Sequence, residues 1–284
     1  MAILVDYNQI FIANLMKQPE IHVRGTADED LVRHMVLNSL RSYRTKFKNE
    51  YGELIICCDN NKNWRKTIFP EYKAHRKVGR EKSSLDWNDI FQTLNKIRRE
   101  IRDVFPYLVI EVEGAEADDV IAIMTEILLK EQNLILSGDK DFGQLQKYDN
   151  VFQFNPMRKH FVEIDDPEKF LKEHILRGDK GDGVPNFLSP DDTFVSGTRQ
   201  VPLSRAKVSK WVDMEPEIFC NYEMSVGYQR NKEMVQLSSE VIPDDVSISI
   251  LECWKNFKPN SRSTMMPYFV ENKLKILMER IDEF

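Results

Sequence analysis

The chain has 284 residues, of which 42% are hydrophobic and 30% charged, and its formal net charge is −6. This length suits one large domain or one domain with a smaller companion, and the composition is that of an ordinary globular protein. No uncharged apolar run approaches the ~18 residues of a membrane span, and no basic stretch of the kind that opens a signal peptide begins the chain. The four cysteines form no Cys-x-x-Cys pair, which argues against a zinc ribbon or a disulfide framework and favours a reduced cytoplasmic protein.

The first half of the chain alternates short apolar runs with longer amphipathic segments. In chain order we predict a strand at Ala2–Val5, a helix over 29–48, a strand at Leu54–Cys58, a helix near 86–104 with Asp86 as its N-cap, a strand at Leu108–Val112, a helix over 116–131 and a strand at Leu134–Leu136. Strands that alternate with helices favour the α/β class, with a mostly parallel central sheet and helices on both faces.

The pattern changes after about residue 165. Helices are predicted near 167–177, 204–212, 216–239 and 265–282, and a segment rich in proline and glycine, 181–202, separates the first two. We therefore expect an α/β core over 1–165 and a smaller, mainly helical region over 166–284.

Charge is distributed unevenly along the chain. Residues 62–82 hold eight Lys or Arg against two Asp or Glu, whereas residues 213–252 hold nine acids against two bases. Because a local basic stretch can bind a phosphate backbone whatever the net charge, the first segment is a candidate nucleic-acid contact; the alternative is a solvated loop. The acidic segment reads most simply as a solvated helix face, with a protein contact as the alternative.

Acidic residues follow every predicted strand of the first half. Because the carboxyl ends of parallel strands share one edge of a sheet, these acids are expected to lie close together there. Two further acids fall in a glycine-rich turn over 178–185. The candidate set is Asp6, Asp59, Glu116, Asp118, Asp119, Asp139, Asp141, Asp179 and Asp182. Taken singly, each is explained as well by helix capping or a turn.

The chemistry of this set favours a hard metal ion. Carboxylates crowded into one cleft repel each other unless a cation is present. Oxygen ligands without His or Cys select Mg²⁺ or Mn²⁺ over Zn²⁺, and a pair of such ions is a common device for displacement at phosphorus.

Six sequence blocks occur in an order that resembles the structure-specific 5′ nucleases, the family of flap endonucleases and of the 5′-exonuclease domains of bacterial DNA polymerases, and in particular its phage ribonuclease H branch. The blocks are Val5-Asp6, Cys57-Cys58-Asp59-Asn60 followed by Trp64-Arg65, Pro70-Glu71-Tyr72-Lys73-Ala74-His75-Arg76, Glu116-Ala117-Asp118-Asp119, Ser137-Gly138-Asp139-Lys140-Asp141 and Leu176-Arg177-Gly178-Asp179-Lys180-Gly181-Asp182.

The resemblance implies a role for each matched residue. A first Mg²⁺ ion, replaceable by Mn²⁺, would be held by Asp6, Asp59, Glu116, Asp118 and Asp139. A second would be held by Asp141, Asp179 and Asp182, with Asp119 bridging or in the outer shell. Lys73 and Arg76 match the basic pair that approaches the scissile phosphate, in an arch over about 62–85 past which the 5′ strand runs. Arg65, Lys66 and Lys77 would contact the nucleic-acid backbone, and Tyr72 would either stack on a base or pack the loop.

The chain departs from the family pattern after Asp182. A Gly-Ile-Gly type hairpin usually follows there and binds duplex, in some members with K⁺, but here the chain continues Val184-Pro185-Asn186. A helix–turn–helix type element over about 176–212 is therefore expected in a remodelled form, and whether its loop binds K⁺, as in some family members, stays open. Its candidate phosphate contacts are Ser196, Gly197, Thr198, Arg199 and Lys207.

The function implied is a Mg²⁺-dependent 5′→3′ exonuclease and flap endonuclease that acts on DNA and RNA·DNA duplexes. By resemblance it would be a monomer that removes RNA primers on the lagging strand in the cytoplasm of a phage-infected bacterium. A sliding clamp and a single-stranded-DNA-binding protein are the partners that the family implies, and no membrane is involved. The alternatives are a PIN-type ribonuclease, a non-catalytic adaptor that binds branched DNA, and a phosphatase of small molecules.

Overall fold

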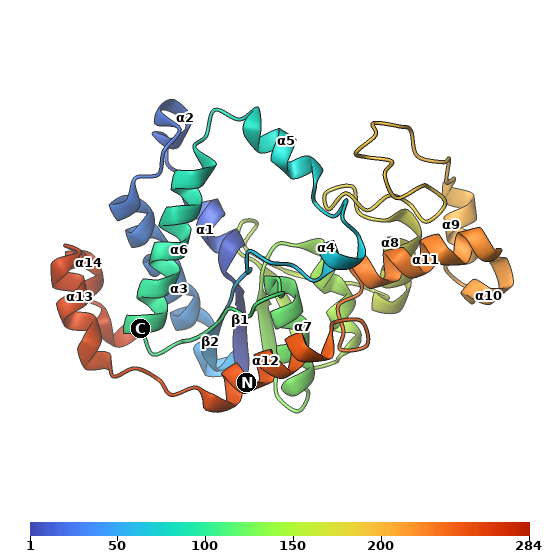
Figure 1. The fold of residues 1–284 in the computed structure, drawn as a ribbon. Coiled ribbons are helices and arrows are strands. Elements are labelled where there is room, and N and C mark those ends of the chain that lie inside the picture. The colour runs from blue at the N-terminus through green and yellow to red at the C-terminus, as the bar shows by residue number, and fades with distance from the viewer.

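A six-stranded sheet with strand order β3-β2-β1-β4-β5-β6 forms the centre of the protein. The computed structural model describes residues 1–284 (Figure 1). The strands are β1 (Ala2–Asp6), β2 (Glu53–Cys57), β3 (Leu108–Ile110), β4 (Asn133–Leu136), β5 (Val151–Asn155) and β6 (His160–Val162). Neighbouring strands are parallel except for the antiparallel pair β5 and β6. The strand order reverses between β1 and β4, and the crevice at such a reversal is where open α/β sheets bind ligands.

Helices connect the strands and cover both faces of the sheet (Figure 1). In the first half these are α1 (Tyr7–Leu15), α2 (Ile21–Arg24), α3 (Glu29–Tyr51), α4 (Arg65–Ile68), α5 (His75–Glu81), α6 (Trp87–Val104), α7 (Ala117–Ile127) and the 3₁₀ helix η1 (Lys140–Lys147). The rest of the chain forms α8 (Pro167–Arg177), α9 (Arg205–Trp211), α10 (Pro216–Phe219), α11 (Tyr222–Val235), α12 (Asp244–Asn256), η2 (Arg262–Thr264), α13 (Met265–Glu271), α14 (Lys275–Met278) and η3 (Ile281–Glu283). No helix combines the length and the apolar character needed to cross a bilayer.

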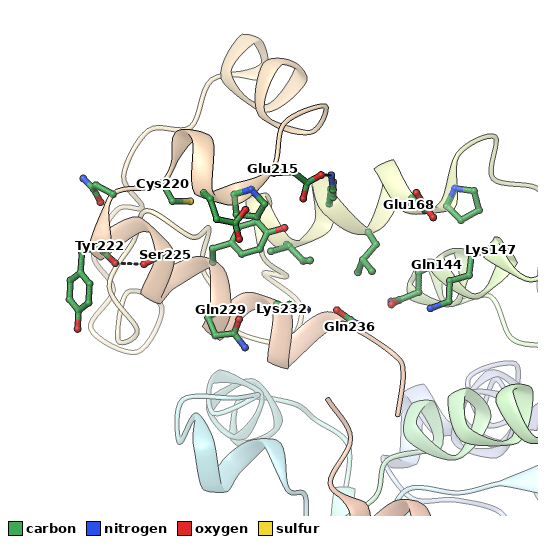
Figure 2. A pocket seen from close by; sticks show the side chains of 18 residues that line it. Gln144, Lys147, Glu168, Glu215, Cys220, Tyr222, Ser225, Gln229, Lys232 and Gln236 are labelled. Atoms are coloured by element: carbon green, nitrogen blue, oxygen red, sulfur yellow. Dashed lines mark hydrogen bonds and ion pairs between the residues drawn. The ribbon is translucent and has the colours of Figure 1, made fainter. Parts of the chain in front are cut away.

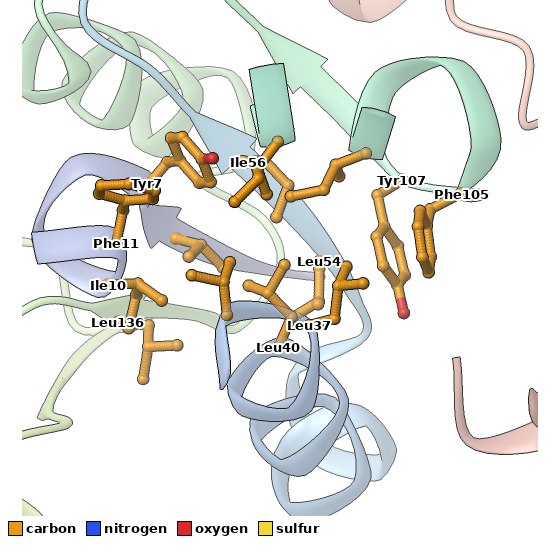
Figure 3. Close-up of a cluster of buried hydrophobic side chains, with 14 of the residues drawn as sticks. Tyr7, Ile10, Phe11, Leu37, Leu40, Leu54, Ile56, Phe105, Tyr107 and Leu136 are labelled. Atoms are coloured by element: carbon orange, nitrogen blue, oxygen red, sulfur yellow. The ribbon is translucent and has the colours of Figure 1, made fainter. Parts of the chain in front are cut away.

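The core consists of two apolar layers, one on each face of the sheet. Along β1 the side chains alternate between them, with Ile3 and Val5 in one layer and Ala2 and Leu4 in the other. The first layer packs against α1, α3, α6 and the C-terminal segment as far as the buried Phe284. Figure 3 shows part of this layer. The second packs against α7, η1 and α12. Because both faces are covered, the central strands are apolar throughout, as the sequence predicted.

The predicted fold class is confirmed, with differences at particular elements. Two helices that were predicted as single are divided: 216–239 becomes α10 and α11, because the Asn221 side chain accepts from the Met224 N–H and starts a new helix. The segment 265–282 likewise becomes three short helices. Helices α1 and α12 and the β5–β6 hairpin were not predicted. Helix α1 follows β1 without a loop, because Asp6 is both the last residue of the strand and the helix N-cap.

The basic segment after β2 leaves the sheet at the carboxyl ends of the strands. It forms α4, turns at Lys73, and continues as α5 to the start of α6, so that α5 lies above the edge of the sheet where α1 begins (Figure 1). Lys73 has a φ of 57°, in the left-handed region. For a residue other than glycine this conformation costs free energy, and it places Lys73 beside the acids at the same edge.

Candidate active site

Four carboxylates lie at the carboxyl edge of the sheet and are called the rim acids here: Asp6, Asp59, Asp118 and Asp139. Asp6 ends β1, and its carboxylate accepts from the Gln9 N–H (3.1 Å) and from the Ser137 hydroxyl (2.9 Å). Asp59 follows β2, and it accepts from the Ala117 N–H (2.8 Å) and from the Asn8 amide (2.5 Å). The hydrogen bonds fix these two side chains, but none of them supplies a full positive charge.

No lysine or arginine forms an ion pair with any of the rim acids. Burial, and then the neighbouring Asp59, raise the pKa of Asp6 to about 7. Burial and Asp139 raise the pKa of Asp118 well above its ordinary range, and burial with Glu116 raises that of Asp59. A bound cation would therefore favour the ionised form of Asp6, Asp59 and Asp118, and the donor set of oxygens alone fits Mg²⁺ or Mn²⁺.

Glu116 lies next to the rim acids, but unlike them it forms an ion pair with a lysine of the arch. The Lys73 ammonium donates to it at 2.6 Å, and the Tyr72 hydroxyl donates at 2.8 Å. Burial by itself would raise the pKa of Glu116, but the charges of Lys73 and Arg65 outweigh burial and lower the pKa to about 2. Glu116 is thus held as an anion, and it ties the base of the arch to the sheet edge.

Asp182 is a second point of attachment for the arch. Arg76 Nη2 lies 2.5 Å from one of its oxygens, and Lys73 Nζ lies 3.5 Å from the other. The turn that carries Asp179 and Asp182 begins at Gly178, whose φ is 66°. A Cβ there would lie 2.3 Å from the Pro185 carbonyl oxygen, so only glycine allows the turn to close.

A third group brings together Asp141, Asp179 and His174, whose ligand atoms all lie within 4.8 Å of one another. Burial, with Asp139 and Asp179 close by, raises the pKa of Asp141 to about 7. For Asp179 burial acts in the same direction, but hydrogen bonds from His174 and Lys140 lower its pKa. The sequence did not indicate His174; the signal that could have found it is its position in the last turn of α8, five residues before Asp179.

Asp119 is sealed inside the protein, so it does not bridge to a metal ion, and the outer-shell position that was its alternative stays a prediction. Its carboxylate is 0% exposed and accepts from Arg65 Nη2 (2.8 Å), Arg65 Nη1 (3.0 Å), the Trp64 indole (3.2 Å) and the Glu116 N–H (2.9 Å). Arg65 in turn is 1% exposed, too deep to contact a nucleic-acid backbone. The pair is a buried ion pair that anchors α4 to the start of α7. The bridging role of Asp119 and the backbone contact of Arg65 are therefore corrected, because each side chain already has its partners inside the fold.

Replacement of Arg65 is expected to destabilise the fold. Arg65→Gln would leave the fully buried Asp119 without its cation, and breaking one side of a buried pair costs about 3 kcal/mol. Lys66→Gln, one residue away and exposed, is the matched control and should change stability by less than about 0.5 kcal/mol. Urea denaturation followed by circular dichroism measures both; equal midpoints for the two variants would contradict the assignment.

Tyr72 packs the arch and is not free to stack on a base. Its side chain is 2% exposed, and its hydroxyl oxygen lies 2.8 Å from a carboxylate oxygen of Glu116 and 2.8 Å from one of Asp182, so that its single proton is shared between them. Of the two roles predicted for this ring, stacking on a base and packing of the loop, the structure supports packing. The other arch cations expected to contact nucleic acid, Lys66 and Lys77, are exposed.

The proposed duplex-binding segment contains a long irregular stretch between α8 and α9. Ser196, Gly197, Thr198 and Arg199 are exposed in it, and Lys207 is exposed on α9. A small apolar cluster of Leu176, Phe187 and Val208 holds this stretch against the two helices. No hydrogen bond or ion pair connects the five candidate residues with the acids.

One of two surface pockets lies at the edge of the sheet where the acids gather. One, of about 790 Å³, lies between the arch and α6 and is lined by Asp59, Lys77, Arg80, Phe91 and Arg98 among others. The other, of about 660 Å³, lies between α8 and α11, and Figure 2 shows Glu215, Cys220 and Lys232 around it. Only the first contains a rim acid, and it is also lined by cations of the arch.

Comparison with known proteins identifies the family. Residues 3–174 match the model of the 5′-3′ exonuclease N-terminal resolvase-like domain, and residues 165–284 match that of the T4 RNase H C-terminal domain. The chain belongs to the 5′-3′ exonuclease family. It is 32% identical to ribonuclease H of Enterobacteria phage T4, over 99% of this chain and 95% of that protein.

Other relatives match only part of this chain in sequence, or are similar to it in fold alone. It is 29% identical to the flap endonuclease Xni of Shewanella oneidensis, over 44% of this chain and 48% of that protein. A structure of the bacteriophage T5 flap endonuclease in complex with DNA and metal ions superposes with a TM-score of 0.61 and 18% identity, over 90% of this chain and 99% of that one.

Proposed function

We propose that this 5′-3′ exonuclease family member is a Mg²⁺-dependent 5′→3′ exonuclease and flap endonuclease that cleaves DNA and RNA·DNA duplexes near a 5′ end. One observation carries the proposal: four carboxylates without a cationic partner, one buried and three half-buried, lie at the sheet reversal, beneath a basic arch. Similarity to the ribonuclease H of phage T4 and to the flap endonuclease Xni supports nuclease activity, and the chemistry of the acids supports a metal cofactor.

The rim acids and Glu116 would hold one ion, and Asp141, Asp179 and Asp182 a second; Mn²⁺ would replace Mg²⁺ in either place. When bound, such ions activate water and stabilise charge on the attacking and leaving oxygens of a phosphodiester. The protein itself would position the strand. Lys73 and Arg76, which contact Glu116 and Asp182 here, are within reach of a phosphate at the same edge and would stabilise its developing charge.

The substrate path follows from the exposed cations. A single 5′ strand would lie in the pocket between the arch and α6, which the exposed side chains of Lys77 and Arg80 line. Duplex would lie along the segment 176–212, through the N–H groups, hydroxyls and charges of Ser196, Gly197, Thr198, Arg199 and Lys207. These contacts address backbone and shape, so cleavage would depend little on base sequence.

The biological role proposed is removal of RNA primers on the lagging strand in the cytoplasm of a phage-infected bacterium. Similarity to the ribonuclease H of phage T4 supports it. A sliding clamp and a single-stranded-DNA-binding protein are proposed as partners, the enzyme acting as a monomer. The division into a core over 1–165 and a helical region over 166–284 is also a proposal, and its support is the change from sheet to helices near that point.

A magnesium titration on a 5′-labelled flap substrate tests the activity. We expect no product in excess chelator, and short 5′ products whose length marks the cut once Mg²⁺ or Mn²⁺ is added. Single-stranded RNA serves as the comparison substrate. Preferential cutting of that RNA would favour a PIN-type ribonuclease, and flap binding without any cleavage would favour an adaptor. Cleavage that persists in chelator would refute the metal dependence.

Lys73→Ala is expected to slow single-turnover cleavage far more than it weakens flap affinity, because its charge would act mainly on the reacting phosphate. We expect a loss of about 10²-fold or more in rate, with a change in affinity of less than about threefold. Lys77→Ala is the matched control: Lys77 is exposed and forms no ion pair, so its loss should weaken binding more than rate. An equal loss of rate and affinity in Lys73→Ala would make it a binding residue only.

A further inference from the structure

Two buried acceptor atoms face each other in the group of Asp141, His174 and Asp179, and neither has a hydrogen-bond partner. They are Nδ1 of His174 and Oδ1 of Asp141, 3.6 Å apart. His174 is only 6% exposed, so water does not reach it freely. Buried polar atoms without partners are uncommon, and a pair of them that point at each other needs a physical explanation.

The other nitrogen of the ring accounts for the orientation of His174. Nε2 lies 3.2 Å from Oδ2 of Asp179, and its hydrogen bond to that carboxylate requires Nε2 to carry the proton. In the neutral ring Nδ1 then presents a lone pair toward Asp141, whose oxygen presents another. A cation between the two atoms removes this repulsion. A ring nitrogen that binds metal while the other donates to a carboxylate is the usual arrangement of metal-binding histidines.

The spacing of the atoms suits a shared ion. Two ligand atoms at roughly 2.1 Å from one metal, at angles between 90° and 110°, lie roughly 3.0–3.5 Å apart. The observed 3.6 Å is close to that range. The Lys140 ammonium, which is 2.7 Å from Asp179 and 3.9 Å from Asp141, supplies positive charge at the same place. Its side chain is 63% exposed and can move out toward solvent.

We propose that His174 is a metal ligand, and that with Asp141 and Asp179 it forms a mixed nitrogen–oxygen site that prefers Mn²⁺ to Mg²⁺. The inference rests on the proposed function in taking Asp141 and Asp179 as ligands of the second ion. Imidazole favours first-row transition metals, whereas Mg²⁺ prefers oxygen. The rim acids offer oxygen alone, so the two ions would differ in selectivity: Mg²⁺ is suited to the rim, and Mn²⁺ to the site with His174.

The test measures metal binding to the full chain without substrate. Pulsed electron paramagnetic resonance of bound Mn²⁺ should show coupling to a ¹⁴N nucleus, and this coupling should disappear in His174→Gln. Calorimetry should show that the substitution weakens the tighter Mn²⁺ site by about 10- to 100-fold and changes Mg²⁺ binding by less than about threefold. His160→Gln, on the exposed strand β6, is the matched control and should keep both the coupling and the affinity.

A second variant covers the case in which glutamine disturbs the fold. His174→Asp offers an oxygen in place of the nitrogen, and it should bind Mg²⁺ while losing the preference for Mn²⁺. Bound Mn²⁺ without nitrogen coupling in the unmodified chain would overturn the inference. Tighter Mn²⁺ binding in His174→Gln would also overturn the inference, because it would mean that the protonated ring of His174 competes with Mn²⁺ for the two carboxylates. If flap cleavage fails while the nitrogen coupling is present, the proposed function is wrong and the metal site with His174 is retained. If cleavage occurs without the coupling, the proposed function is retained and the role of His174 as a ligand is wrong.

Discussion

Asp139→Asn is expected to abolish cleavage while DNA affinity stays near that of the unmodified chain. Asp139 is a rim acid without an ion pair, and it lies close enough to Asp6 and Asp118 to raise the pKa of both. Loss of a ligand at such a site removes charge stabilisation of several kcal/mol, so single-turnover rates should fall about a thousandfold or more. Removal of one negative charge also reduces repulsion toward phosphate, which is why binding should be preserved.

The measurement pairs single-turnover cleavage of a labelled flap with fluorescence anisotropy on the same DNA. Asp59→Asn should behave in the same way. Asp103→Asn is the matched control, because Asp103 is an exposed acid near the end of α6 that is not one of the proposed metal ligands. This substitution should leave rate and affinity unchanged. Full turnover by Asp139→Asn would remove the assignment of the rim acids as metal ligands.

Without divalent metal, the protein is expected to lose stability as the pH rises from about 5 to 8. Burial, and then Asp59, raise the pKa of Asp6 from its ordinary value of about 4 to about 7. In that window the folded state holds a proton that the unfolded state has released, so the free energy of unfolding falls as pH increases. Between pH 5 and pH 8, Asp6 alone accounts for a loss of about 3 kcal/mol, or roughly 5–10 °C in Tm. Asp141, whose pKa is also raised to about 7, acts in the same direction.

Thermal melting in chelator and in Mg²⁺ at each pH measures this effect. Added Mg²⁺ should remove most of the loss at pH 8, because a bound ion stabilises the ionised carboxylates. Asp6→Asn should reduce the pH dependence in chelator, since it removes one titrating group, and Asp141 should account for a remaining decline. A melting temperature in chelator that is constant or rises from about pH 5 to pH 8 would show that the acids are already neutralised by other means.

Local patterns in the sequence were enough to predict the sheet and the edge at which the acids gather. Apolar runs such as Leu54–Cys58 mark buried strands, because both faces of a parallel sheet are covered. Asp6 and Asp59 follow two of these strands, and parallel strands place their carboxyl ends together. The helix that begins after Asp86 was also predictable, because its side chain caps the N–H groups of Asn88 and Asp89.

Residues far apart in the chain decided the rest, because charge and burial depend on neighbours that no local pattern reveals. Asp118 and Asp119 are adjacent and chemically alike, yet one is unpaired at the rim and the other is sealed against Arg65, from which 54 positions separate it. Arg65 was predicted as a nucleic-acid contact and Tyr72 as either a base-stacking or a packing residue, but packing buries both. The position of His174 before Asp179 is a weak signal in the sequence, and only the turn at Gly178 brings it to Asp141 and Asp179. The sequence by itself determined which residue types gather at one edge of the sheet. Only the tertiary structure decided which of them pair with protein cations and which have no cationic partner, because an ion pair forms only where folding brings both side chains together.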